Sequence, residues 1–128
     1  MSAHTLLIGV DLVDCSRIES MLEHDSGFLA LTFTPLELED CAADVSRLGG
    51  RWAAKEATMK ALGKGIGSVA PTDIEIRSGP EGAPTLTLAG SAERRAAELG
   101  AATWSVSLSH ESGFALAFVI MTIGEPSV

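Results

Sequence analysis

The sequence is poor in cysteine, in basic residues and in long apolar runs, and each shortage excludes a class of protein. It has two cysteines and no signal-peptide pattern, so we expect a cytoplasmic protein without a disulfide framework, its cysteines buried as small apolar residues. The longest apolar stretch, within 113–124, spans about ten residues, well short of the roughly 18 of a transmembrane helix. The sequence therefore excludes a disulfide-linked scaffold and an integral membrane protein.

Basic residues are scarce as well: nine lysines and arginines stand against 17 aspartates and glutamates, a formal net charge of −8. A chain this acidic does not bind nucleic acid or an anionic membrane over a broad, sequence-independent surface. Any polyanionic ligand must be held by a few local cations. Apolar residues, in contrast, are abundant, at 46% against 20% charged. This surplus predicts surface buried between subunits, so we expect an oligomer.

The 128 residues fit one domain, 1–128, large enough to bury about two thirds of the surface that the unfolded chain would expose. Apolar runs and period-two alternation predict strands at 5–13, 72–78, 84–88, 103–109 and 114–123. Helices are predicted at 16–24, from Pro35 onward, at 46–62 and at 91–99, with Ser16, Thr34 and Ser91 as N-caps. The last strand is apolar on both faces, which predicts a central place in the sheet or a subunit interface.

Asp11 is the first candidate for chemistry, because it lies in an apolar strand between Val10 and Leu12. A carboxylate that loses its hydration without a partner is costly, so Asp11 needs a cation nearby. Two interpretations stay open: a functional carboxylate, and an ordinary structural one that either forms a core salt bridge with an arginine or lysine or lies at the exposed end of the strand.

The predicted helix 46–62 carries the second candidate, Glu56 and Lys60, one turn apart. They lie at the edge of an apolar stripe formed by Leu48, Trp52, Met59 and Leu62. Alanines beyond them allow another element to approach closely. Alone, the two residues form an ordinary helix ion pair worth about 0.3 kcal/mol. The glycines of 63–67 predict a helix end and an irregular loop whose backbone approaches a ligand.

Several other polar residues lie near these two candidates. Lys55 projects into the apolar stripe, and we expect it to extend its ammonium to solvent, without a role in a site. Arg51 and Lys64 are either solvated or directed at phosphate. His110 is predicted just past the strand 103–109, in a loop beside serines, where histidine is more often structural than catalytic.

The candidate residues indicate a function only when they are considered together. Mg²⁺ is commonly held by one or two carboxylates, with waters and substrate phosphate oxygens completing its octahedron, and Asp11 and Glu56 meet that need. Lys60, Arg51 and His110 would supply positive charge for a diphosphate. The joint pattern indicates phosphoryl transfer, although spacing alone does not name the substrate.

In this order and at these separations, the stretches resemble the bacterial holo-acyl-carrier-protein synthase family of 4′-phosphopantetheinyl transferases. The run Trp-Ala-Ala-Lys-Glu-Ala-x-x-Lys-Ala is the most specific part, and the resemblance covers nearly the whole chain. It is carried by GVDLVDCSRIE (9–19), FTPLELE (33–39), RWAAKEATMKALGKG (51–65), the DIEI and GAPTLTLAG strands of the hairpin, and SLSHESGFALAFVI (107–120).

The resemblance implies transfer of the phosphopantetheine arm of coenzyme A to a serine of an apo-acyl carrier protein, with Mg²⁺ as cofactor and 3′,5′-ADP as the leaving product. It implies an α+β fold, with an antiparallel-rich sheet packed against one long helix and several short ones. It also implies a homotrimer with active sites between neighbouring subunits.

Site residues are implied position by position. Asp11 and Glu56 correspond to the Mg²⁺ ligands of the family, and Lys60 to the lysine that contacts the diphosphate. Contacts to coenzyme A correspond to Arg51, Lys60, Gly63, Pro84 and His110. Arg17 corresponds to the site where the first helix docks the acidic carrier protein.

Two other functions remain open from the residues alone: a non-catalytic trimeric module that binds coenzyme A, and an Mg²⁺-dependent hydrolase of small diphosphates, in which water replaces serine. Within the first helix and its following loop, Arg17 is followed by acids and a histidine. We therefore expect weak electrostatic steering of an acidic carrier. The sequence leaves open whether that carrier serves fatty acid synthesis, polyketide synthesis or a large synthase.

Overall fold

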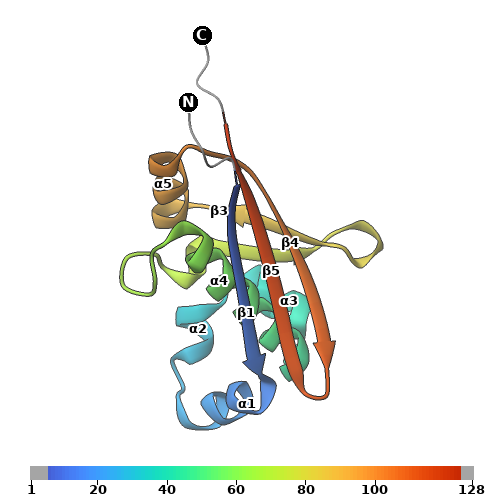
Figure 1. The fold of residues 1–128 in the computed structure, drawn as a ribbon. Helices are drawn as coiled ribbons and strands as arrows, with labels where there is room; N and C mark the ends of the chain where they lie inside the picture. Colours follow the sequence, from blue (N-terminus) through green and yellow to red (C-terminus); the bar gives the residue numbers. More distant parts are fainter. Residues whose placement is uncertain (1–5, 125–128) are drawn as a thin grey trace.

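A computed structural model describes residues 6–124 as a three-stranded antiparallel sheet with a long helix packed on one face (Figure 1). The sheet has the order β1 (Leu6–Asp14), β5 (Phe114–Ile123) and β4 (Ala101–Glu111). The turn between β4 and β5 consists of Ser112 and Gly113, both with positive φ. The prediction of a central place for the last strand is confirmed, since β5 pairs on both edges.

The long helix, α4 (Val45–Leu62), packs mainly against β1 and β5. Asp44 caps its start by accepting a hydrogen bond from the backbone N–H of Arg47, and Gly63 ends it with a φ of 70°. The predicted apolar stripe is confirmed: Leu48, Met59 and Leu62 are buried, and Trp52 is half-buried.

Strand β1 and helix α4 approach each other backbone to backbone at Gly9. A Cβ atom at this position would lie 1.8 Å from the carbonyl oxygen of Ala57, so no residue larger than glycine fits without a shift. Ala53 and Ala57 are fully buried on the same side of the helix. The predicted close approach at the alanine side of the helix is therefore confirmed, and its partner is β1.

The remaining elements surround α4 on the side away from the sheet and at its ends (Figure 1). A separate antiparallel hairpin joins β2 (Ile74–Ser78) to β3 (Pro84–Leu88). Four short helices complete the α+β architecture: α1 (Cys15–His24), α2 (Phe28–Thr32), α3 (Pro35–Cys41) and α5 (Gly90–Leu99). Single turns of 3₁₀ helix occur at Pro71–Asp73 and Pro80–Gly82.

One of the three predicted N-caps is confirmed and two are wrong. Thr34 forms a capping box with Glu37 at the start of α3. The cap of α1 is Asp14, which accepts a hydrogen bond from the Ser16 backbone N–H at 3.0 Å. Helix α5 has no side-chain cap, and the Ser91 hydroxyl donates to Asp73 instead. In both cases the helix begins one residue before the serine, and a carboxylate accepts the backbone N–H of that serine.

The cysteines lie where the composition predicts them. Cys15 and Cys41 are free thiols buried in the core. Burial is the main reason that the pKa of each thiol is raised, which keeps it protonated. Between residues 6 and 124, no helix is both long enough and apolar enough to cross a membrane.

Gly9→Ala is expected to lower the free energy of unfolding by at least about 2 kcal/mol, because the added methyl group overlaps the Ala57 carbonyl. Urea unfolding measures this loss. Gly27→Ala is the matched control, since a Cβ there meets its nearest atom at an ordinary 3.6 Å. The control is expected to stay within about 0.5 kcal/mol of wild type. Equal stability of the two variants would contradict a tight contact at Gly9.

Candidate active site

Asp11 and Lys60, which are 49 residues apart in sequence, meet where β1 crosses α4. The Lys60 ammonium lies 3.1 Å from Oδ1 of Asp11 and also donates to the Val10 carbonyl at 3.0 Å. Side chains two residues apart in a strand share a face, so the contact of Gly9 with α4 directs Asp11 toward the same helix. Asp11 thus has the cation that its apolar strand requires.

Glu56 lies one turn before Lys60 on α4 and completes a group of three charged side chains with Asp11. Burial and, after it, the negative charge of Asp11 raise the pKa of Glu56, while Lys60 and Arg17 act in the opposite direction. The two carboxylates are therefore near enough to repel each other. Lys60 pairs with Asp11, so the interpretation of Glu56 and Lys60 as a simple helix ion pair is wrong for the described residues.

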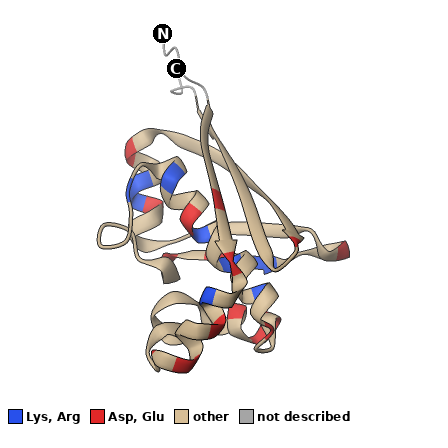
Figure 2. Cartoon of the chain, turned by 60° about the horizontal axis from the view of Figure 1, so that its bottom comes forward, with Lys and Arg blue, Asp and Glu red and all other residues tan. Residues whose placement is uncertain are grey.

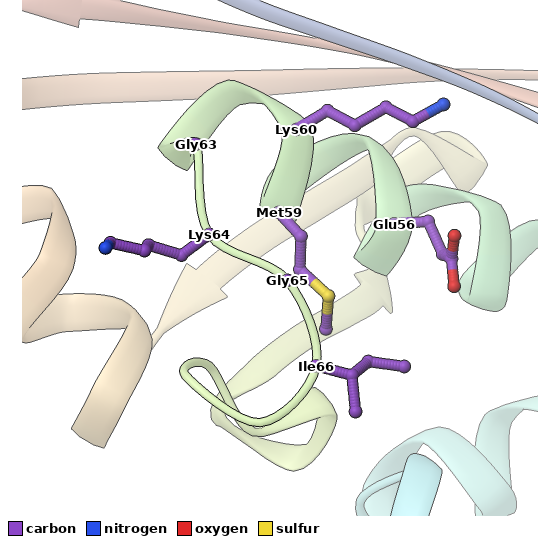
Figure 3. A pocket seen from close by; sticks show the side chains of 7 residues that line it. All are labelled: Glu56, Met59, Lys60, Gly63, Lys64, Gly65 and Ile66. Carbon is purple, nitrogen blue, oxygen red and sulfur yellow. The ribbon is translucent and has the colours of Figure 1, made fainter.

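A cavity of about 390 Å³ opens beside this group (Figure 3). Its walls come from the last turns of α4 and the glycine-rich segment that follows, namely Glu56, Met59, Lys60, Gly63, Lys64, Gly65 and Ile66. In Figure 3 the Glu56 carboxylate and the Met59 and Ile66 side chains lie on one side of this segment, whereas Lys64 extends to the other. The cavity thus combines backbone, apolar and charged surface.

Arg51, nearer the start of α4, and His110, on β4, lie outside the lining of this cavity. The buried Arg51 guanidinium donates from Nη2 to the Ser78 hydroxyl at 2.9 Å, and its Nε has no partner in the part of the chain described. His110 Nε2 lies 3.1 Å from the Ser46 carbonyl oxygen. The structure thus separates these residues, and Pro84 on β3, from the Asp11 group.

The expected loop position of His110 is wrong. Strand β4 continues to Glu111, and His110 pairs with Ala115 of β5. The reason is the short turn at Ser112 and Gly113, which keeps both strands paired almost to their ends. A strand position holds the imidazole more firmly than a loop would.

The expectation that Lys55 reaches solvent is also wrong. Its side chain is fully buried and its ammonium lies 2.7 Å from Oε1 of Glu37. Burial lowers the pKa of Lys55, and the Glu37 carboxylate opposes that shift. The spacing of residues 37 and 55 carries no signal of this pairing, since they belong to different helices.

Comparisons with known proteins agree with this geometry. Residues 7–119 match the family model described as the 4′-phosphopantetheinyl transferase superfamily. The chain belongs to this superfamily. A holo-[acyl-carrier-protein] synthase of Herpetosiphon aurantiacus is 43% identical over 123 residues, covering 90% of this chain and 97% of that protein. The resemblance seen in the sequence is thereby confirmed, as is its assignment to an enzyme family.

Solved structures of the superfamily share the fold. The Helicobacter pylori holo-[acyl-carrier-protein] synthase in complex with coenzyme A superposes with a TM-score of 0.81 at 35% identity, over 91% of this chain and 100% of that one. A holo-ACP-synthase from Plasmodium yoelii gives a TM-score of 0.84 at 27% identity, over 98% and 100%. The α+β fold that the resemblance implied is confirmed.

The carboxylates of this superfamily member have the chemistry of a magnesium site. Asp11 and Glu56 offer hard oxygen donors. Burial and, after it, the negative charge of Asp11 raise the pKa of Glu56, and a divalent cation would relieve the repulsion between the two carboxylates. Residues 6–124 contain no group of three or more histidine, cysteine or acidic side chains suited to a metal. Two carboxylates fit Mg²⁺, which keeps waters and phosphate oxygens as its other ligands, better than Zn²⁺.

Proposed function

We propose that this protein transfers the 4′-phosphopantetheine arm of coenzyme A to a serine hydroxyl of an apo-acyl carrier protein, with Mg²⁺ bound and with release of 3′,5′-ADP. The observation that carries the proposal is the meeting of Asp11, Glu56 and Lys60 beside a cavity in a chain of this superfamily. The names of the relatives and the coenzyme A bound to the Helicobacter pylori synthase support the substrates.

In the proposed reaction Asp11 and Glu56 would hold Mg²⁺, which when bound neutralises charge on the diphosphate. An ammonium group has three donors, and Lys60 uses two of them on Asp11 and Val10. Its remaining donor suits a phosphate oxygen, since the side chain is 56% exposed. The serine oxygen bonds to the phosphorus that carries pantetheine, and the bond from that phosphorus to the bridging oxygen breaks. The serine proton passes to Glu56 or to a water held by the carboxylates.

We propose that the protein acts as a homotrimer. The face of the sheet turned away from α4 is apolar along β1 and β5, and seven large side chains on it are at least 40% exposed. They are Leu6, Ile8, Val10, Leu12, Phe114, Leu116 and Phe118. A contiguous apolar surface of this kind marks a protein–protein interface. It supports the oligomer that the apolar composition predicts.

A trimer would also explain why the proposed coenzyme A contacts are divided. Arg51 precedes Glu56 on α4 by five residues, which places the two about 140° apart around the helix. Arg51 is therefore placed apart from Asp11, Glu56 and Lys60. Pro84 pairs with Ser78, the hydrogen-bond partner of Arg51, and His110 lies beside Gly50 of α4. We propose that Arg51, Pro84 and His110 of one subunit complete the coenzyme A site of its neighbour, together with Lys60 and Gly63 there.

We further propose that residues 1–128 are one domain and that the carrier docks at α1. The first proposal is supported by one cluster of buried side chains that extends from Val13 to Met121. The second is supported by Arg17, which is exposed on α1 and near enough to the site to lower the pKa of Glu56.

The function is tested by intact-mass spectrometry of an apo-acyl carrier protein incubated with this protein, coenzyme A and Mg²⁺. The expected result is a gain of one phosphopantetheine that EDTA abolishes. Free phosphopantetheine without modified carrier would indicate a diphosphate hydrolase. Binding of coenzyme A without either product, for every carrier tried, would indicate a non-catalytic module.

Asp11→Asn and Glu56→Gln are each expected to remove most turnover, because each takes one charged oxygen from the proposed magnesium site. Initial rates at several Mg²⁺ concentrations measure the loss, and circular dichroism checks that the fold is retained. Glu39→Gln, an exposed carboxylate on α3, is the matched control and should keep wild-type activity. Near-normal rates in either site variant would refute the metal assignment.

The oligomer is expected to have a mass in solution of three times the 13.3 kDa of the chain, measured by light scattering. Phe118→Glu puts a charge on the apolar face of β5 and should yield monomers that transfer little. Leu31→Glu, on a side chain that is 74% exposed on α2, should remain trimeric. A monomeric and active wild type would contradict the shared site.

Low salt is expected to slow carrier modification. The chain carries a net charge of −8, and its basic residues are interspersed with acidic ones in the described structure (Figure 2). Repulsion between two acidic proteins acts over about 30 Å at 0.01 M salt and about 8 Å at 0.15 M. The value of kcat/KM for an acidic carrier should therefore rise with salt, while kcat at saturating carrier stays constant. Faster reaction at low salt would point to a local basic docking surface that outweighs the net charge.

A further inference from the structure

Lys55 and Glu37 form an ion pair in which both side chains are fully excluded from solvent. All three donors of the Lys55 ammonium are used: one on Glu37 Oε1 at 2.7 Å, one on the Pro71 carbonyl at 2.8 Å and one on the Ile74 carbonyl. The ammonium also lies 5.8 Å from the centre of the Phe33 ring. The lysine is thus tied to the backbone of the segment that leads into β2.

The Glu37 carboxylate is equally engaged. Its Oε1 accepts the backbone N–H of Thr34 and its Oε2 accepts that of Ile76, each at 2.9 Å. One buried pair therefore links α3, α4, the turn at Pro71 and strand β2. Such a pair adds little net stability, because desolvation cancels most of the attraction and well-packed apolar residues would do as well. Its distinctive property is geometric, since it allows one arrangement of four elements.

This arrangement bears directly on the cavity beside Glu56. The segment 63–70 starts at the end of α4 and supplies four lining residues, including Ile66, whose side chain is 63% exposed. Pro71 follows this segment directly, and Lys55 holds its carbonyl. The segment is therefore attached to α4 at both ends, by the chain at Gly63 and by the lysine at Pro71.

Lys55 also fixes the rotation of α4 about its own axis. Neighbouring residues of a helix lie about 100° apart, so an inward lysine at 55 places Glu56 toward β1 and the cavity. On the opposite side of the helix, the contact of Gly9 with Ala57 limits rotation toward the sheet. The helix is held between these two contacts.

We propose that Lys55, held by Glu37, is a positioning residue for the transfer site. It fixes the far end of segment 63–70 and the rotation of α4, so that Glu56, Lys60 and the segment line one cavity. This role rests on the proposed function, and Lys55 itself does not contact substrate.

Lys55→Met removes the three donors at nearly constant side-chain volume, but it leaves the Glu37 carboxylate buried without its cation. The double variant Lys55→Met with Glu37→Gln removes that negative charge as well. Both are expected to raise the KM for coenzyme A about tenfold, because the cavity wall is displaced. Hydrogen exchange of the substrate-free protein should become faster in peptides covering 63–71 and stay unchanged in β5, which lies in the separate three-stranded sheet. Comparison of coenzyme A KM with kcat at saturation separates the loss of positioning from a loss of folded enzyme.

Met121→Ala is the stability control, since it opens a cavity in the fully buried core of β5. Assayed well below its Tm, it should keep the wild-type KM and the wild-type exchange of 63–71 despite its lower Tm. If the Lys55 variants behave like this control, or if the double variant folds with unchanged KM and exchange, the positioning role is wrong. A wild type that transfers nothing to any carrier would overturn the proposed function instead, while the exchange measurement would still report whether Lys55 holds the segment.

Discussion

The contact between Gly9 and Ala57 is the constraint on which the arrangement of this protein depends. Because no side chain separates the backbones of β1 and α4 there, the strand lies nearer the helix than ordinary packing permits. Asp11 follows Gly9 by two residues and thus reaches the turn of α4 that carries Glu56 and Lys60. A contact between two residues without functional groups of their own determines where three charged ones meet.

Two lysines of α4, five residues apart, show how burial decides the use of a charge. Lys60 lies at the surface, and its ammonium retains the freedom to contact a ligand. Lys55 is enclosed, and every donor it has is committed to protein oxygens. Lys60 is therefore free to bind a ligand, whereas Lys55 holds parts of the fold together. Composition and helix propensity do not distinguish the two lysines. Both are needed, because the ammonium of Lys60 reaches a ligand in the right position only if helix α4 is itself held in place.

Local patterns predicted the elements well and the long-range contacts only in part. The apolar stripe of α4, the capping box at Thr34 and the limits of β5 follow from spacing within one segment, and all are confirmed. The caps at Ser16 and Ser91 failed because each helix begins one residue earlier, with the serine in its first turn and the serine's N–H bonded to Asp14 or to the distant Asp73. His110 and Lys55 failed for a different reason, since the pairing of β4 with β5 and the partner of a buried lysine are set by tertiary structure. The meeting of Asp11 with Glu56 was suggested by chemistry and by family resemblance, not by distance in the sequence.

The sheet has an apolar outer face along β1 and β5, but β4 presents hydroxyls there, at Ser105, Ser107 and Ser109. This difference gives the apolar surface a boundary. Strands that pack on β1 and β5 gain from excluding water, whereas hydroxyls on the neighbouring strand are as well satisfied by water as by another protein. In the proposed homotrimer, this face would be the patch that copies of the chain bury between them in a closed ring. The apolar face that the proposed trimer would bury therefore ends where β4 begins.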